Sequence, residues 1–274
     1  MKKVILSVSL CATLFACENV EKKATPYLQA AQEAYAAGNY NEAKLQIDSI
    51  KLLYPKAFET RRAGIYLMQD VELAEQEKSL LYLDSLLHEK QQAVESIKHK
   101  YTFEKDAEYQ QLGLYLHPSQ VIEKNIHRSY LRFQVNERGD MSMTSIYCGS
   151  SPIHHVSVKV TASDGTFAET PAAKNVYETT DLGKHIEKAE FKLGEDGNVI
   201  GFLYLNKDKN IKVNYLGERP YSISLTTADR QAAASVYDLA QLLSSITQIK
   251  KEIEEANLEI EFIKRKIQER KTEE

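Results

Sequence analysis

The C-terminal segment, residues 236–270, carries an apolar pattern that leaves few choices for its structure. Its apolar residues recur at alternating steps of three and four, and most positions between them are charged or polar. The recurring residues are Leu239, Leu242, Ile246, Ile249, Ile253, Ala256, Ile260, Ile263 and Ile267. A helix with this repeat has a continuous apolar seam, which is typical of a helix that supercoils against a partner. The pattern therefore predicts a long C-terminal helix in a coiled coil.

A second segment of the same chain, predicted to be helical from Phe58 to Gln111, offers a partner. It follows the same template at Tyr66, Leu73, Leu80, Leu83, Leu87, Val94, Ile97 and Tyr101, with Gln69, Gln76 and Lys90 as imperfect positions. An insertion whose two ends both join helices closes most simply when those helices lie side by side. We therefore expect an α+β fold, with a long antiparallel helical (coiled-coil) stalk and an inserted antiparallel β-sandwich-like domain. A parallel homodimer is the alternative.

The region between the two helices alternates apolar and polar residues, which is typical of half-buried strands. The alternation is visible around Phe133, Val158, Phe191, Val213 and Ile223. Ile200, Phe202 and Tyr204 also alternate and are predicted to form a strand. Turn sequences such as Asp164 with Gly165 separate the runs. About seven or eight mostly antiparallel strands in a small sandwich or half-open barrel are expected.

The N-terminus begins with Met1, Lys2 and Lys3, followed by an apolar run from Val4 to Ala16. This pattern is typical of a secretory leader and is too short for a membrane-spanning helix. The residues Leu14, Phe15, Ala16 and Cys17 resemble the lipobox of bacterial lipoproteins, although Phe15 departs from the usual small or hydroxylated residue. The resemblance implies cleavage before Cys17, a diacylglyceryl thioether on its sulfur and an acylated amino group, with palmitate as the fatty acid. An ordinary signal peptide is the alternative.

Residues 26–55 form another recognisable pattern, in which two short helical runs flank Gly38 and Asn39. Small and apolar residues recur at Tyr27, Ala30, Ala31, Gly38, Tyr40, Ala43, Ile47, Ile50 and Pro55. This spacing resembles one tetratricopeptide repeat, and it is similar to the repeats of outer-membrane assembly lipoproteins. Because a solenoid normally needs about three repeats, a single helical hairpin packed on the stalk is favoured over a peptide-binding groove.

Charge and cysteine content exclude several classes of protein. The formal net charge is -4, and removal of a leader that contains Lys2 and Lys3 lowers it to -6. A mildly acidic chain argues against nucleic acid or an anionic membrane surface as the main partner. Of the three cysteines, Cys11 lies in the leader and Cys17 at its processing site, so Cys148 has no partner for an internal disulfide.

Few residues suggest catalysis or ligand binding. Cys148 with His154 or His155 is the one combination that resembles a nucleophile and its base. Cys148 lies in an apolar strand with no evident third group, so a buried structural thiol is favoured. His154, His155 and His185 lack the spacing of a metal site, and we predict no catalytic residue, cofactor or metal. The tyrosines of the β-region form either a contact surface or ordinary strand packing.

The predicted organisation is a signal peptide over residues 1–16, a lipidated tether over 17–25, a helical hairpin plus first stalk helix over 26–115, a β-domain over 116–228 and a C-terminal stalk helix over 229–274. The chain resembles lipoproteins of Gram-negative, Bacteroidetes-like cell envelopes. The resemblance implies a non-enzymatic scaffold, lipid-anchored in the outer membrane on its periplasmic side or at the cell surface, that presents the β-domain to another envelope protein or a glycan. The alternatives are an envelope cysteine hydrolase using Cys148 with His154 or His155, and a periplasmic adaptor of an export system.

Overall fold

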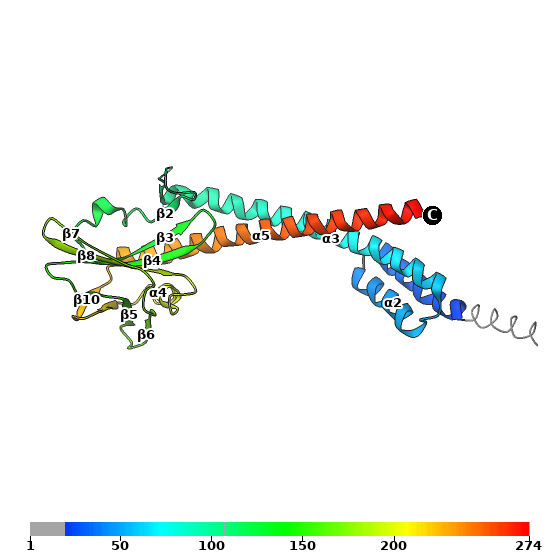
Figure 1. The fold of residues 1–274 in the computed structure, drawn as a ribbon, viewed down its shortest axis with the longest axis horizontal. Helices are drawn as coiled ribbons and strands as arrows, with labels where there is room; N and C mark the ends of the chain where they lie inside the picture. The colour runs from blue at the N-terminus through cyan, green and yellow to red at the C-terminus, as the bar shows by residue number, and fades with distance from the viewer. Residues whose placement is uncertain (1–19, 107, 274) are drawn as a thin grey trace, which may run out of the picture. The chain divides into compact units, whose positions relative to one another are not determined.

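The computed structural model describes residues 20–106 and 108–273 of the chain. The predicted signal peptide and the lipidation site Cys17 lie outside these residues. The chain divides into two compact units, the first made of residues up to Ser85 and from Lys251, and the second of Leu86–Lys250. The two longest helices contribute to both units. The mixed α and β class predicted from the sequence is confirmed (Figure 1).

Three helices form the N-terminal part of unit 1: a helical segment over residues 20–36, α2 (Tyr40–Leu53) and the first part of α3 (Phe58–Ile97). Gly38 adopts a positive φ of 71° in the turn before α2, a conformation that glycine reaches without a steric cost. The hairpin packs on α3 through a core that includes Ala31, Ala43 and Val71. The first helix begins earlier than expected, since residues 20–25 are already helical. The Glu21 carboxylate in this stretch accepts the backbone N–H and the hydroxyl of Thr60, which joins it to α3.

The last helix, α5 (Thr227–Glu273), returns along α3 within unit 1. Arg270 of α5 forms an ion pair with Asp70 at 2.8 Å, and Lys264 forms one with Glu77 at 3.0 Å. Because the residue number falls along α5 as it rises along α3, the two segments are antiparallel. Ile263 of the predicted seam is buried. Within unit 1, α5 thus packs against α3 of the same chain.

The helix α3 ends at Ile97, not at Gln111 as predicted from the sequence. A 3₁₀ turn, η1 (Lys98–Lys100), follows it, and the chain then becomes extended. The strand β1 (Thr102–Glu104) lies inside the range predicted to be helix, and β2 (Leu114–Leu116) begins at residue 114, so the six-stranded sheet begins before residue 116. The side chain of Tyr101 explains the early end, because its hydroxyl donates to the carbonyl of Ser235 at 2.8 Å and fixes the chain against α5.

Unit 2 contains two antiparallel sheets, with α4 and the first part of α5 beside them (Figure 1). The six-stranded sheet has the order β1-β2-β3-β4-β8-β7, and the four-stranded sheet has the order β10-β9-β5-β6. The strands are β1 (Thr102–Glu104), β2 (Leu114–Leu116), β3 (Tyr130–Asn136), β4 (Met141–Gly149), β5 (Ser157–Ala162), β6 (Phe167–Glu169), β7 (Val176–Asp181), β8 (Lys184–Lys192), β9 (Ile211–Leu216) and β10 (Tyr221–Ser224).

One apolar core joins both sheets to the helices of unit 2. It contains Phe133 of β3, Val160 of β5 and Val213 of β9, together with Val236 and Leu239 of α5. The start of α5 is a reciprocal cap, in which the backbone N–H of Asp229 donates to the Thr226 hydroxyl and the Asp229 carboxylate accepts the backbone N–H of Thr226. This cap sets the direction in which the helix leaves the β-region.

The segment predicted as a strand around Ile200, Phe202 and Tyr204 is instead the helix α4 (Val199–Leu205). Its sequence is apolar at nearly every position, so a period of two and a helical period fit it almost equally well. The buried Asp196 decides between them, because its carboxylate accepts the backbone N–H of Ile200 at 2.6 Å and satisfies a free donor of the first helical turn.

A buried side chain covers the part of β3 that the short strand β2 leaves unpaired. The amide of Gln120 donates to the carbonyl of Leu131 at 2.8 Å and accepts the backbone N–H of Phe133 at 2.7 Å. Gln120 thus makes the two hydrogen bonds that a neighbouring strand would make with this part of β3. A 3₁₀ turn, η2 (Ile122–Lys124), follows Gln120 in the chain.

Candidate functional site

The residues of the predicted thiol site do not meet in the structure. Cys148 is half-buried on β4 as a free thiol, and burial raises its pKa, with Lys184 acting in the opposite direction. Within the residues that the structure describes, no hydrogen bond joins Cys148 to either histidine. The ring of His155 contacts Ser145, and the ring of His154 contacts Glu178. A protonated thiol without an imidazole neighbour is a poor nucleophile.

A different set of residues has the connectivity of a nucleophile, a base and an acid. The Oγ atom of Ser145 lies 2.8 Å from Nε2 of His155, and Nδ1 of the same ring lies 2.9 Å from Oε2 of Glu187. An ionised carboxylate can only accept hydrogen bonds, so Nδ1 carries a proton and donates it to Glu187. In neutral His155 the Nε2 atom then accepts the hydroxyl proton of Ser145. Sequence analysis found neither Ser145 nor Glu187.

The sheet brings these residues together. Ser145 lies on β4 and Glu187 on the neighbouring strand β8; across the ladder Ser145 is paired with Ala189, and Glu187 with Tyr147. Residues at steps of two share one face of a strand, so Ser145 and Glu187 both point into the core side of the sheet. His155 comes from the loop before β5. A polar residue at an inward position of each strand was the one available sequence signal.

Glu187 also holds the backbone of the loop that carries the two histidines. Its Oε1 accepts the N–H groups of Ile153 at 2.6 Å and His154 at 2.9 Å, and its Oε2 accepts the N–H of His155 at 2.9 Å. Burial raises the pKa of Glu187, but these bonds and the one from the His155 ring more than offset this effect and lower the pKa below its ordinary value. The carboxylate is therefore a charged anchor for three consecutive residues.

This arrangement is closed to substrates. The side chains of Ser145 and His155 are fully buried, and 1% of Glu187 is exposed. The ring of Tyr215 packs edge-on against the His155 ring with centroids 5.1 Å apart. Adding a Cβ atom to Gly217 would place it 2.3 Å from the carbonyl oxygen of Ile153, so the loop also lies directly against β9. Such a network fixes the position of a loop, because every buried polar group in it has a partner.

The exposed side of the same loop carries a second charged group. The Nδ1 atom of His154 lies 3.0 Å and 3.1 Å from the two carboxylate oxygens of Glu178 on β7. The hydrogen bond to Glu178 and the charge of that carboxylate raise the pKa of His154. The backbone of His154 has a positive φ of 51°, which is uncommon outside glycine. His154, Glu178 and Glu187 together place one ligand atom each within 4.8 Å of one another.

The tyrosines of the β-region divide into two groups. Tyr147, Tyr215 and Tyr221 pack together, with ring centroids between 4.8 Å and 6.5 Å apart. The hydroxyl of Tyr215 is fully buried and contacts the carbonyls of Tyr130 and Ile146 in the other sheet. These tyrosines belong to the core. Tyr177 on β7 is instead exposed, and Tyr204 on α4 is partly exposed with its hydroxyl donating to Asp238, so the contact-surface interpretation applies to these two and not to the core group.

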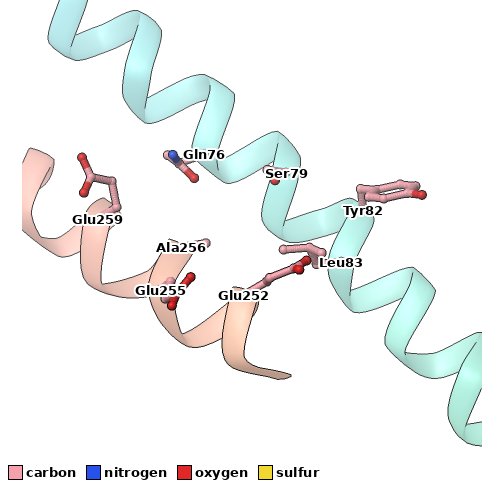
Figure 2. Close-up of a pocket in the computed structure, with 8 residues that line it drawn as sticks. All are labelled: Gln76, Ser79, Tyr82, Leu83, Glu252, Glu255, Ala256 and Glu259. Atoms are coloured by element: carbon pink, nitrogen blue, oxygen red, sulfur yellow. The ribbon is translucent and has the colours of Figure 1, made fainter. Parts of the chain in front are cut away.

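A groove of about 560 Å³ lies between α3 and α5 in unit 1 (Figure 2). Leu83 and Ala256 point into the space between the helices, and Gln76, one of the imperfect seam positions, lies at its edge. The small side chain of Ala256 leaves this part of the seam incompletely filled. Three glutamates of α5 give the groove an acidic rim: Glu252, Glu255 and Glu259.

None of the helices in the described part of the chain is both long and apolar enough to span a bilayer. Comparison with known proteins gives no match: no family model matches the chain, and no curated protein or solved structure is significantly similar to it.

Proposed function

We propose that this chain is a non-enzymatic lipoprotein of a Gram-negative, Bacteroidetes-like envelope, anchored through Cys17 in the outer membrane, that presents its β-domain to another envelope protein. The anchor rests on the sequence from Leu14 to Cys17 and its resemblance to a lipobox. Several acyl chains on one residue would give a stable attachment without a spanning helix. In this proposal α3 and α5 form a coiled-coil stalk and the two sheets form a β-sandwich.

The observation that carries the proposal is the β7–β8 hairpin surface, which we define as Val176, Tyr177 and Leu182. β7 is an edge strand of six residues, whereas the other described edge strands, β1, β6 and β10, have three, three and four. All three residues of the surface are exposed, and Leu182 is 83% exposed at the tip of the hairpin. A free strand edge with apolar side chains is suited to pairing with an extended segment of another protein.

The conformation of Leu182 supports a role for its side chain. Its φ is 46°, a left-handed value at which glycine or asparagine would be cheaper. An exposed leucine gains nothing from burial in this chain that would offset this cost. Its presence is explained if a partner covers it.

The buried site supports the non-enzymatic part of the proposal. Ser145, His155 and Glu187 are sealed in the core, and the Cys148 thiol lacks an imidazole neighbour. A cysteine hydrolase is therefore the weaker alternative. The adaptor alternative is also weaker, since in export adaptors β segments flank the helical hairpin, whereas here the helices flank the β-region.

Site-specific crosslinking in intact cells tests the proposal. A photoreactive amino acid at Leu182 is expected to label one recurrent envelope protein. Leu205, at the end of α4, is the matched control, because it is also an exposed leucine of unit 2, with 77% of its surface accessible. Equal labelling from both positions, or no protein adduct from Leu182, would contradict the proposal. Capture of a saccharide by the unmodified protein, lost on Leu182→Asp, would identify a glycan as the partner instead.

A further inference from the structure

Three segments of unit 2 converge on one imidazole and two carboxylates. His154 comes from the loop before β5, Glu178 from β7 and Glu187 from β8. The residues are separated by 24 and 33 positions in the sequence, so no local spacing connects them. His154 and Glu178 are about half exposed, with side-chain accessibilities of 44% and 42%, and can be reached from solvent.

The two carboxylates form a like-charge pair across the sheet. Glu178 and Glu187 are directly opposite each other in the β7–β8 ladder. Like charges at such positions destabilise a sheet, so a positive charge is favoured beside them. The His155 ring and the backbone N–H groups stabilise the charge of Glu187, whereas the described hydrogen bonds of the Glu178 carboxylate come from the His154 ring alone.

The separation of the ring nitrogen and the carboxylate fits a shared metal ion. Nδ1 of His154 lies 3.0 Å and 3.1 Å from the two oxygens of Glu178. With about 2.1 Å from a zinc ion to each donor atom, this separation corresponds to an angle of about 95° at the metal. A small outward rotation of these two exposed side chains would widen it. The ion would replace the proton that Nδ1 now shares with the carboxylate, and that proton would leave to solvent.

Glu187 has a different place in this arrangement. Both of its oxygens already accept two N–H groups each, so its lone pairs are occupied. Two ligand atoms on opposite sides of one zinc ion are about 4.2 Å apart. The ligand atoms of this cluster lie within 4.8 Å of one another, which is wider than that span. Glu187 therefore suits a neighbouring charge that orients the His154 backbone and attracts a metal-bound water, and not a direct ligand.

We propose that His154 and Glu178 bind a divalent transition-metal ion of the zinc class, with water in the remaining positions and Glu187 as the adjacent negative charge. An imidazole nitrogen beside carboxylate oxygen favours zinc over calcium or magnesium, which prefer oxygen ligands only. Such an ion would link the loop to the edge strand β7. This inference does not depend on the lipoprotein proposal.

Zinc titration of the full-length protein by isothermal calorimetry tests the site. The wild-type chain is expected to bind one Zn²⁺ ion and to show a higher Tm in its presence. His154→Asn and Glu178→Gln should each lower the affinity at least about tenfold, as loss of a metal-site residue typically does. Asparagine is chosen because it tolerates the left-handed backbone of His154. His185→Ala is the matched control, since this histidine lies on the same β7–β8 hairpin as Glu178 but outside the cluster.

The outcomes separate clearly. Retained affinity in His185→Ala with loss in both other variants supports the site. Absence of zinc binding to the wild-type protein overturns it. Equal affinity in wild type and His154→Asn would also overturn it, because the ion would then be bound elsewhere. Circular dichroism of each variant establishes that it is folded before affinities are compared.

Discussion

Replacing Glu187 by glutamine should destabilise unit 2 far more than an isosteric change normally does. Each carboxylate oxygen of Glu187 accepts two N–H groups, so whichever oxygen becomes the amide NH₂ deprives at least one buried backbone N–H of the loop of its acceptor, and the charge that the remaining N–H groups stabilise is lost. A buried donor without a partner costs about 1–3 kcal/mol, which gives an expected loss of about 3 kcal/mol or more for Glu187→Gln. That is a large part of the ~5–15 kcal/mol by which a domain is normally stable.

Urea unfolding followed by tyrosine fluorescence measures this loss, since the chain has no tryptophan. Glu190→Gln is the control, because Glu190 lies on the same strand with its side chain exposed, and it should change stability by less than about 0.5 kcal/mol. Two units can unfold separately, so hydrogen exchange of residues 150–156 provides a local measurement. A loss below about 1 kcal/mol, or unchanged exchange in this loop, would refute the reasoning about the carboxylate.

Three further predictions concern the anchor, the helix pair and the response to pH. Cys17→Ala should accumulate as an unprocessed, unlipidated precursor on gels of labelled cells, and a lipidated species of mature size would contradict the lipoprotein proposal. Ile263→Asp buries an unpaired carboxylate beside α3 and should lower the free energy of unfolding in urea by on the order of 3 kcal/mol. Leu258→Asp is the control, because Leu258 is exposed and its replacement should change this free energy little. Equal effects of the two changes would show that Ile263 is not part of the seam. The pKa of Glu187 is lowered, so its contribution to stability is present above its unfolded value near 4.5 and is lost as the pH falls through the folded pKa. The pKa of His154 is raised above 6.5, so its contribution to stability is present below that value and is lost as the pH rises through the folded pKa. A Tm that does not change with pH in either range would refute both assignments.

The sequence predicted the longer helices and most strands because their apolar periodicity is long and regular. The seam of α5 repeats over many turns, and the strands around Phe133, Val158 and Val213 alternate cleanly. The prediction failed where a local pattern is short or uniform. The run from Val199 to Leu205 is apolar almost throughout, so its periodicity does not separate helix from strand; in the structure the Asp196 carboxylate accepts the N–H of Ile200, four residues later, at the start of the helix.

The candidate site was hidden for a different reason. Cys148 and the histidines are close in sequence, and that proximity suggested a thiol site. Contacts in a sheet depend on strand register, which brings Glu187 beside Tyr147 although the two are far apart along the chain. The choice between Ser145 and Cys148 as the neighbour of His155 depended on the inward or outward phase of β4. The sequence shows which side chains of β4 point inward only if a polar residue such as Ser145 is accepted at a core position.

The hydrogen bonds of Gln120 have a consequence for self-association. The carbonyl of Leu131 and the N–H of Phe133 are the groups that another chain would need to extend the sheet along this stretch of β3. Unsatisfied groups of this kind act as templates for aggregation, and proteins usually block them with charges, prolines or bulges. Here the neutral side-chain amide of Gln120 forms hydrogen bonds with both groups. Protection of this stretch against intermolecular strand addition therefore depends on a single glutamine rather than on the composition of the surface.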